Sequence, residues 1–292
     1  MSLVSRILVP VEFSPRCRGA AQYAEALASH FRCEIVLLHV VMPLAHVYGT
    51  PEALAYSSAS DLTTDRVEQM RAQLESFPVE LPEGLPITRE VLEGDPARTI
   101  AGYANAGKFG LIVMPTHGYG PFRRFLLGSV TAKVLHDANC PIWTGPHLEQ
   151  APEHESIRFR KVLCAIDLGP DSLTVLGWAG GFAREFGAEM TIVHAIPIST
   201  ARLDGVYFDP DWRMQVIRTA RERIASFQKD VDAPGEVCIE TGDTPAAIAA
   251  AATQSNADVL VIGRGRSAGV LGRLRTNAYA ILRESPCPVV TV

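Results

Sequence analysis

The sequence predicts an α/β protein made of two tandem copies of one domain, each an open, twisted, mostly parallel five-stranded sheet with helices on both faces. Three observations predict this: an internal repeat, apolar runs that alternate with amphipathic helical segments, and a polar break between the copies. The length of 292 residues suits two domains of ordinary size. A content of 47% hydrophobic and 20% charged residues is typical of a globular chain.

The internal repeat extends over the whole chain. The apolar segment 6–13 aligns with 161–168, and the helical stripe that follows the first segment recurs after the second. Further matches follow in the same order: His39 with His194, Gly94-Asp95 with Gly242-Asp243, 111–114 with 259–262, and Cys140-Pro141 with Cys287-Pro288. Matches that keep their order over this length indicate a duplicated domain.

Each copy reads as five strands separated by four helices. A continuously apolar run such as 6–11 is expected of a strand covered on both faces. Ser14 and Pro15 then predict a helix start, with the serine as N-cap, and Asp95-Pro96 repeats the signal. The expected order in the first copy is strand 6–11, a helix after Ser14, strand 35–41, helix 61–77, strand 87–92, helix 96–106, strand 110–115, helix 129–137 and strand 141–144. Because strands and helices alternate, we expect a parallel sheet.

A polar, proline-containing segment breaks every period between the two copies. We therefore predict a first domain at 1–146, a linker at 147–156 and a second domain at 157–292. The two last strands, 141–144 and 288–292, are expected to pair edge to edge, which makes the second domain a pseudo-dimer partner of the first. We also expect a homodimer of the tandem chain.

Charge and composition disfavour several classes of partner. With a net charge of −5 and a pI near 5.9, neither nucleic acid nor an anionic membrane is expected as the main partner. No apolar run approaches the roughly eighteen residues of a membrane helix, and no signal-peptide pattern is present. The six cysteines lack CxxC pairing, which indicates free thiols in a reducing compartment, with a redox-sensing thiol as the alternative. A cytoplasmic protein is expected.

The loop after the fourth strand has the features of a phosphate cradle. In open parallel sheets, ligands bind beyond the carboxyl ends of the strands. Gly118 and Gly120 allow the backbone to approach a ligand closely, and Gly128 with Ser129 opens the next helix. Free N–H groups at that helix start attract phosphate, and the hydroxyls of Ser129 and Thr131 add donors. The cradle has no P-loop lysine.

This segment resembles the signature of the universal stress protein family, in which a glycine is followed by nine residues and then by Gly-Ser or Gly-Thr. Here Gly118 and Gly128-Ser129 match in spacing and type. The segments 10–14 and 38–40, the Gly94-Asp95 turn and the Cys140-Pro141 strand also look like that family, so the resemblance covers nearly the whole chain, twice. It implies an adenine nucleotide alpha hydrolase-like fold. It also implies ATP as the ligand in one branch of the family, while another branch binds none.

The resemblance implies a defined set of ligand contacts in the first copy. The strand end would meet the adenine or the ribose, Val40 would flank the base, and Met114 would line the ribose side. The full expected set is Pro10, Val11, Glu12, Val40, Met114, His117, Gly118, Gly128, Ser129, Val130 and Thr131. The corresponding residues of the second copy are Ile166, Asp167, Ile262 and Gly263.

The chain departs from the family pattern in both copies. Pro115 replaces the first signature glycine, which removes a backbone donor and fixes φ, and Glu12 replaces the usual aspartate. In the second copy Arg266 replaces the second glycine, and Thr276-Asn277 stands where Gly-Ser should open the last helix. Side chains there would crowd a phosphate, so that adenine recognition alone could persist in the second copy.

A regulatory binding module is the function that the sequence favours over an enzyme. No nucleophile–base set and no metal-ligand spacing is visible, and His39 and His194 are expected to be hydrogen-bonded structural histidines. We expect a stress-response protein that binds ATP, with or without Mg²⁺, in its first domain. The alternatives are a slow ATPase or autophosphorylating enzyme with Ser129 or Thr131 as acceptor, a nucleotide-free structural stress protein, and a flavin-carrying or adenylating relative of the same superfamily.

Overall fold

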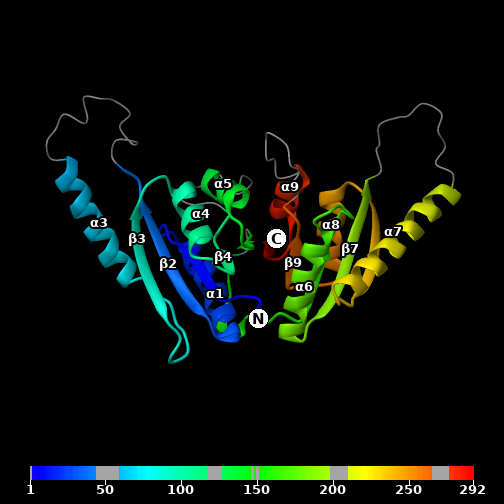
Figure 1. Ribbon diagram of the computed structural model, residues 1–292, viewed down its shortest axis with the longest axis horizontal. Coiled ribbons are helices and arrows are strands. Elements are labelled where there is room, and N and C mark those ends of the chain that lie inside the picture. Colours follow the sequence, from blue (N-terminus) through cyan, green and yellow to red (C-terminus); the bar gives the residue numbers. More distant parts are fainter. Residues whose placement is uncertain are drawn as a thin grey trace. The chain divides into compact units, whose positions relative to one another are not determined.

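The chain forms two compact units, Met1–Ile157 and Arg158–Val292, in the computed structural model (Figure 1). The structure describes residues 2–43, 59–116, 127–145, 148, 151–197, 210–264 and 276–292. Each unit is an α/β layer structure of its own, as the repeat predicts. We describe them separately.

The first unit is a parallel sheet with the strand order β3-β2-β1-β4-β5. Its elements are β1 (Arg6–Pro10), α1 (Pro15–Phe31), β2 (Glu34–Val41), α3 (Ala59–Glu75), β3 (Ile87–Glu93), α4 (Pro96–Ala106), β4 (Leu111–Val113), α5 (Ser129–Asp137), β5 (Ile142–Thr144) and the short 3₁₀ helix η3 (His154–Ser156). The strand order reverses between β1 and β4, and this is the position at which parallel sheets bind ligands.

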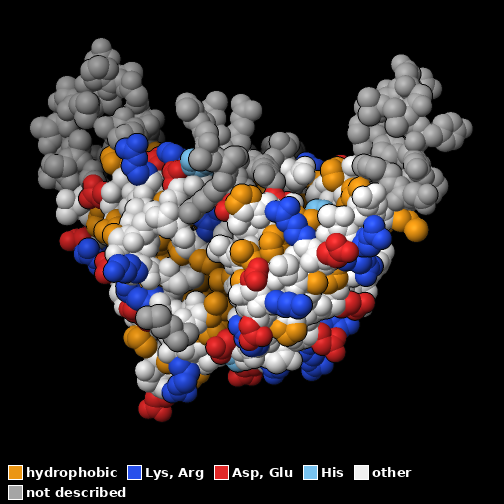
Figure 2. All heavy atoms as spheres, turned by 45° about the vertical axis from the view of Figure 1, so that its right-hand side comes forward, with side chains coloured by type: hydrophobic (Ala, Val, Ile, Leu, Met, Phe, Trp, Pro, Cys, Tyr) orange, Lys and Arg blue, Asp and Glu red, His pale blue; other side chains and the backbone are white. Residues whose placement is uncertain are grey.

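The second unit repeats this topology in the order β8-β7-β6-β9-β10. Its elements are β6 (Lys161–Ala165), α6 (Ser172–Phe186), β7 (Glu189–Pro197), α7 (Pro210–Asp230), β8 (Glu236–Gly242), α8 (Thr244–Gln254), β9 (Val259–Ile262), α9 (Thr276–Glu284) and β10 (Val289–Thr291). On the face that Figure 2 presents, acidic and basic side chains are interspersed.

The central strands are buried on both faces, which explains their continuous apolar runs. Ile7, Leu8 and Val9 of β1 have no exposed surface. Right-handed crossovers put α1 and α3 on one face of the sheet and α4 and α5, which pack on each other, on the opposite face. The fourth strand is shorter than the predicted 110–115, because Pro115 has no N–H with which to continue the ladder.

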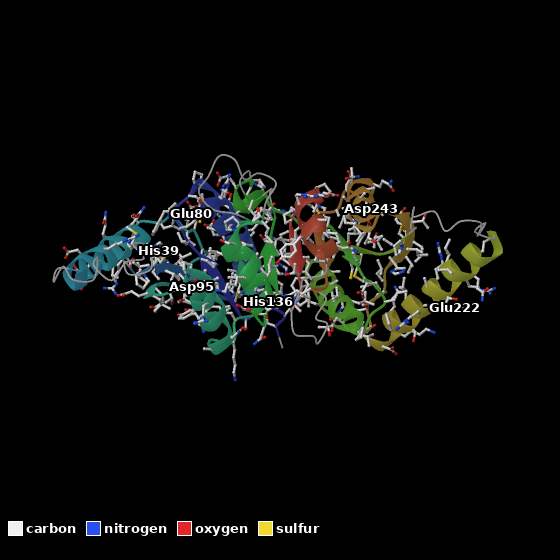
Figure 3. The ribbon with its side chains drawn as sticks, turned by 90° about the horizontal axis from the view of Figure 1, so that it is seen from above. His39, Glu80, Asp95, His136, Glu222 and Asp243 are labelled. Atoms are coloured by element: carbon white, nitrogen blue, oxygen red, sulfur yellow. The ribbon has the colours of Figure 1, made fainter. Side chains whose placement is uncertain are left out.

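A side-chain cap is present at the helix starts of Asp95 and Asp243, but not at Ser14, where the sequence also predicts one. Asp95 accepts a hydrogen bond from the backbone N–H of Arg98 at 2.9 Å and so caps α4. Asp243 caps α8 in the same way, and Figure 3 labels both aspartates. The Ser14 side chain makes no capping hydrogen bond, since its hydroxyl donates to the Glu12 carboxylate at 2.8 Å. The predicted cap is therefore wrong in detail, although the helix begins where expected.

The segment that precedes the second unit packs against α1. Leu148 is fully buried, and a Cβ on Gly19 would collide with its carbonyl oxygen, so the two backbones touch. Glu25 of α1, also fully buried, lies 2.6 Å from Arg18 and 3.3 Å from His154. The described part of the predicted linker is thus a packed component of the first unit.

None of the six cysteines forms a disulfide bond, and all six lie in the described part of the chain. Burial raises the pKa of Cys33 and Cys287 to about 11 and that of Cys164 to about 12. These thiols therefore stay protonated near neutral pH, which disfavours the thiolate that a redox sensor needs.

Replacing Gly19 with alanine tests the docking of this segment. The added Cβ would force the Leu148 backbone away from α1, and we expect a loss of about 1–3 kcal/mol in the free energy of unfolding. Urea unfolding and hydrogen exchange over 151–157 measure the effect. Gly102→Ala is the matched control, because that position is an exposed helix site with open space, where alanine should stabilise by about 0.5–1 kcal/mol. Equal stability of Gly19→Ala and the native chain would contradict the docking.

Glu25 should make stability depend on pH. Its burial raises its pKa above 4.5, while the charges of Arg18 and His154 and hydrogen bonds oppose the rise. The folded chain thus holds this proton more tightly than the unfolded chain, so its contribution to the free energy of unfolding falls as pH rises from about 4.5 through the raised pKa. Glu25→Gln cannot ionise. The native-minus-variant difference in urea unfolding should therefore fall over this range, and a difference that rises would refute the assignment.

Candidate functional site

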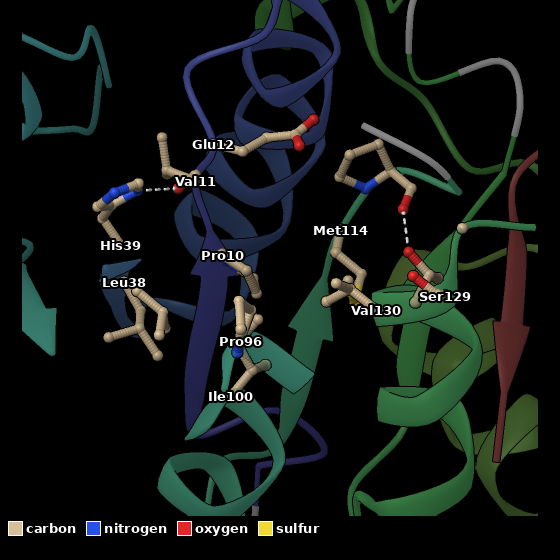
Figure 4. Close-up of a pocket in the computed structure, with 14 residues that line it drawn as sticks. Pro10, Val11, Glu12, Leu38, His39, Pro96, Ile100, Met114, Ser129 and Val130 are labelled. Atoms are coloured by element: carbon tan, nitrogen blue, oxygen red, sulfur yellow. Dashed lines mark hydrogen bonds between the residues drawn. The ribbon is translucent and has the colours of Figure 1, made fainter. Parts of the chain in front are cut away.

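A cavity of about 370 Å³ lies at the carboxyl ends of β1 and β4, where the strand order reverses (Figure 4). It is bounded by the end of β2, by the first turn of α4 and by the first turn of α5. The lining residues are Pro10, Val11, Glu12, Leu38, His39, Val40, Pro96, Ile100, Met114, Pro115, Gly128, Ser129, Val130 and Thr131.

His39 fixes the backbone at the end of β1. Its ring Nδ1 lies 2.7 Å from the carbonyl oxygen of Val11, which can only accept, so Nδ1 carries the hydrogen (Figure 4). Burial lowers the pKa of His39 below 6.5, which keeps the ring neutral at neutral pH. Phe13 packs on the same ring at a centroid distance of 4.7 Å. These contacts support the structural role expected for this histidine.

The end of β2 presents an open backbone edge to the cavity. The carbonyl of Leu38 faces β1 and accepts from the N–H of Val11 at 2.9 Å, whereas the carbonyl of Val41 faces β3 and accepts from Gly94 at 3.0 Å. Peptide groups of successive strand residues point to opposite sides. The N–H and C=O of Val40 therefore point to the side of β1, beyond the place where β1 ends. They form an adjacent donor and acceptor at the cavity wall.

Glu12, which follows β1, is held in a defined position by two hydrogen bonds. One carboxylate oxygen accepts from the Ser14 hydroxyl at 2.8 Å, and the backbone N–H of Glu12 lies 3.3 Å from the sulfur of Cys17. The chain turns at Phe13, whose φ of 64° is in the left-handed region. The strand ends before this turn, and Glu12 lines the cavity.

The start of α5 forms the other end of the cavity. The N–H of Gly128 donates to the carbonyl of Thr116 at 2.8 Å, and the hydroxyl of Thr131 donates to the carbonyl of Pro115 at 3.0 Å. These two bonds join the ends of the loop that the sequence identifies as the cradle. The backbone N–H groups of Ser129, Val130 and Thr131 belong to the first helical turn, where no helical carbonyl accepts them. They are the donors available to an anion.

All the predicted site residues that the structure describes in the first unit line this one cavity. The set comprises Pro10, Val11, Glu12, Val40, Met114, Gly128, Ser129, Val130 and Thr131. His117 and Gly118 lie outside the described residues. The expected ligand contacts did not include five of the lining residues, Leu38, His39, Pro96, Ile100 and Pro115. The sequence did indicate a place for Pro96 and Ile100 near the cavity, because a helix that begins at Pro96 must start at the edge of the sheet where the strands end.

The second unit has a cavity of about 620 Å³ at the equivalent place. The four predicted residues of this copy all line it: Ile166, Asp167, Ile262 and Gly263. His194 repeats the contact of its counterpart, with Nδ1 2.9 Å from the carbonyl oxygen of Ile166. The strand-end architecture is thus common to both units.

Two negative findings apply to the described ranges alone. No helix within them is long and apolar enough to cross a membrane. Within the same ranges, no group of three or more His, Cys, Asp or Glu side chains is placed to hold a metal ion.

The chain has clear relatives among known proteins. The sequence model of the universal stress protein family matches residues 4–144 and again 158–292. A universal stress protein of Methanocaldococcus jannaschii is 31% identical over 141 residues, which cover 48% of this chain and 81% of the relative. One of Mycolicibacterium smegmatis is 26% identical, covering 76% and 74%. The solved structure of a universal stress protein from Archaeoglobus fulgidus DSM 4304 superimposes with a TM-score of 0.62 at 22% identity, covering 100% and 98%.

The bond between Thr131 and Pro115 is testable through stability without any ligand. Thr131→Val keeps the shape of the side chain but leaves the buried Pro115 carbonyl without its donor, which should cost about 1–3 kcal/mol of the free energy of unfolding. Thr131→Ser, which keeps the hydroxyl, should cost less. Urea unfolding of the ligand-free variants measures both. If the hydroxyl served a ligand alone, both variants would unfold like the native protein.

Proposed function

The chain belongs to the universal stress protein family, and we propose that its first unit binds ATP in the cavity between β1 and β4 and that this occupancy regulates a stress response. The observation that carries the proposal is the presence of two complementary features at opposite ends of one cavity. One is the open backbone edge at Val40, and the other is the free first turn of α5.

The edge at Val40 suits the base. Its adjacent N–H and C=O match the acceptor and the amino donor on the Watson–Crick edge of adenine. The apolar side chains of Val11, Val40 and Met114 can cover the faces of a planar ring. Glu12 is placed to accept from ribose hydroxyls, as an acidic residue does after the second strand of dinucleotide-binding folds.

The first turn of α5 suits the phosphates. The N–H groups of Ser129, Val130 and Thr131 and the helix dipole favour a negative group at this point. The Thr131 hydroxyl donates to Pro115, so its proton is not offered to a phosphate, and its backbone N–H remains. Ser129 is exposed and adds a hydroxyl donor. A Mg²⁺ ion would be held mainly by the phosphates and water, as is usual for this ion.

The proposal also covers the assembly of the protein and its location in the cell. The second unit acts as a pseudo-dimer partner through the last strands of the two repeats, and the tandem chain forms a homodimer. An exposed strand edge invites such pairing. A cytoplasmic location is supported by six cysteines without a disulfide bond, as is usual in a reducing compartment.

Calorimetry on nucleotide-stripped protein tests the ATP site. We expect one ATP per chain, and Gly128→Val should weaken binding at least about tenfold, or 1.4 kcal/mol, because its branched side chain crowds the phosphates. Gly128 has φ −62° and ψ 146°, which valine adopts without strain, so the fold should survive.

Thr276→Val is the matched control, since it puts the same side chain at the start of α9 in the second unit and should leave ATP affinity unchanged. Absence of ATP binding by the native chain would refute the proposal. Equal affinity of Gly128→Val and the native chain would also refute it, because the ligand would then lie elsewhere.

A further inference from the structure

A separate cavity of about 340 Å³ lies in the second unit between α7, the end of β7 and the turn that follows β6. This volume is within the range of small-molecule sites. Five of the described lining residues come from α7, and the other two are His194 and Leu168. Of the described lining residues, only His194 also lines the larger cavity of this unit. The place is therefore distinct from the strand-end cavity that recurs in both units.

The residue beside the strand-end histidine differs between the two units. In the first unit the ring of Phe13 packs on the ring of His39, with a centroid distance of 4.7 Å. In the second unit Leu168 occupies the position of Phe13, with a φ of 60° against 64°. Because leucine is smaller than phenylalanine, it leaves room beside His194 that the aromatic ring takes up in the first unit. That room is part of the cavity.

Arg223 supplies a positive charge to this cavity. The side chain lines the cavity and belongs to an exposed residue. Its guanidinium lies 5.5 Å from the centroid of the Phe227 ring, a contact that limits where the charge can lie. The residues three and four positions away along α7 are uncharged: Thr219, Ala220, Ser226 and Phe227. No side chain at these helical spacings can therefore pair with the guanidinium as an acid.

The charge at the cavity is not offset by nearby acidic residues of the lining. No acidic side chain is found among the described residues that line the cavity. Glu222 is next to Arg223 in sequence, but successive residues of a helix do not face each other, and Glu222 has Arg218 four positions before it. An anionic group is thus favoured at Arg223. A carboxylate suits it best, because it can accept two parallel hydrogen bonds from one guanidinium.

The rest of the lining suits a compact apolar body with few polar atoms. Leu168, Val216 and Ala220 form the apolar part of the wall. The Nδ1 atom of His194 donates to the carbonyl of Ile166 at 2.9 Å, so that Nε2 of the neutral ring is left as an acceptor. The cavity therefore combines one charged end with an apolar wall.

From these contacts we propose that this cavity binds a small organic carboxylate with a compact apolar body. The carboxylate pairs with Arg223, and the body packs on Leu168, Val216 and Ala220. The inference rests on residues of the second unit and does not depend on ATP binding in the first. It gives the chain a ligand site apart from the strand-end cavities.

Benzoate and benzamide are the probes, titrated by calorimetry into the native chain. The two molecules have nearly the same shape, but only benzoate carries a charge at neutral pH. We expect benzoate to bind at least about tenfold more tightly than benzamide, because the amide cannot form the charged pair with Arg223. Acetate has the charge without the ring, and it should also bind at least about tenfold more weakly than benzoate.

Variants of two lining residues locate the site. Arg223→Met keeps an unbranched side chain next to Phe227 but removes the charge, and it should weaken benzoate binding at least about tenfold. Arg221→Met is the matched control, since Arg221 is exposed on the same helix and is not among the lining residues, and it should leave the affinity unchanged. Leu168→Phe restores the residue of the first unit and should weaken binding by a similar factor. Its thermal unfolding should match that of the native chain, because Phe13 has nearly the same φ.

Three results would overturn the inference. The first is an equal affinity for benzoate and benzamide, or no binding of benzoate at all. The second is benzoate binding that survives both Arg223→Met and Leu168→Phe, because the probe would then lie elsewhere. The third is an equal loss of affinity in Arg223→Met and Arg221→Met, because the effect would then come from the overall charge of α7. If Leu168→Phe does not fold, Arg223→Met and its control decide the question.

Discussion

The central strand of each sheet ends before its neighbour, and the ligand cavities depend on this difference in length. In the first unit β1 stops at Pro10, paired with Leu38, while β2 continues to Val41. The unpaired edge of β2 would be costly if it stayed buried without partners. A ligand that offers a donor and an acceptor would satisfy it. The site that we propose for ATP thus starts from unpaired backbone groups at the end of β2.

A strained turn enforces that early end in both repeats. Phe13 and Leu168 follow the central strands with φ of 64° and 60°, a region that costs an L-residue roughly 1–2 kcal/mol. The cost is offset locally, because a histidine from the neighbouring strand donates to the carbonyl two residues earlier in each unit. Recurrence of both features in sequences that have diverged elsewhere indicates that the turn is a requirement of the fold. Glu12 and Asp167, which precede the turn, line the two cavities.

Local patterns were sufficient to predict the order of elements, and the family resemblance supplied most of the residues that line the first cavity. Apolar period and helix-start residues depend on neighbours in sequence, and the ends of parallel strands meet at one edge. Side-chain partnerships could not be predicted in the same way. Ser14 has the residue type of an N-cap, yet its hydroxyl turns to Glu12, and Thr131 has the type of a phosphate ligand, yet it closes the cradle loop onto Pro115. Each of these hydroxyls had two available partners, and only the folded geometry decides between them.

Duplication followed by local substitution explains how one fold carries different contacts on its two copies. Glu25 of α1, buried beside Arg18 and His154, corresponds to Gly180 of α6, where an added Cβ would collide with Ala233. The first copy thus uses an ionic contact to hold the segment that follows β5, and the second uses close packing at the same helix face. The cavities diverge in the same way, since the strand ends repeat while lining residues change, as from Pro10 to Ala165 and from Glu12 to Asp167. A stable sheet tolerates such changes at strand ends and outer helix faces because its free energy of folding resides mainly in the buried central strands.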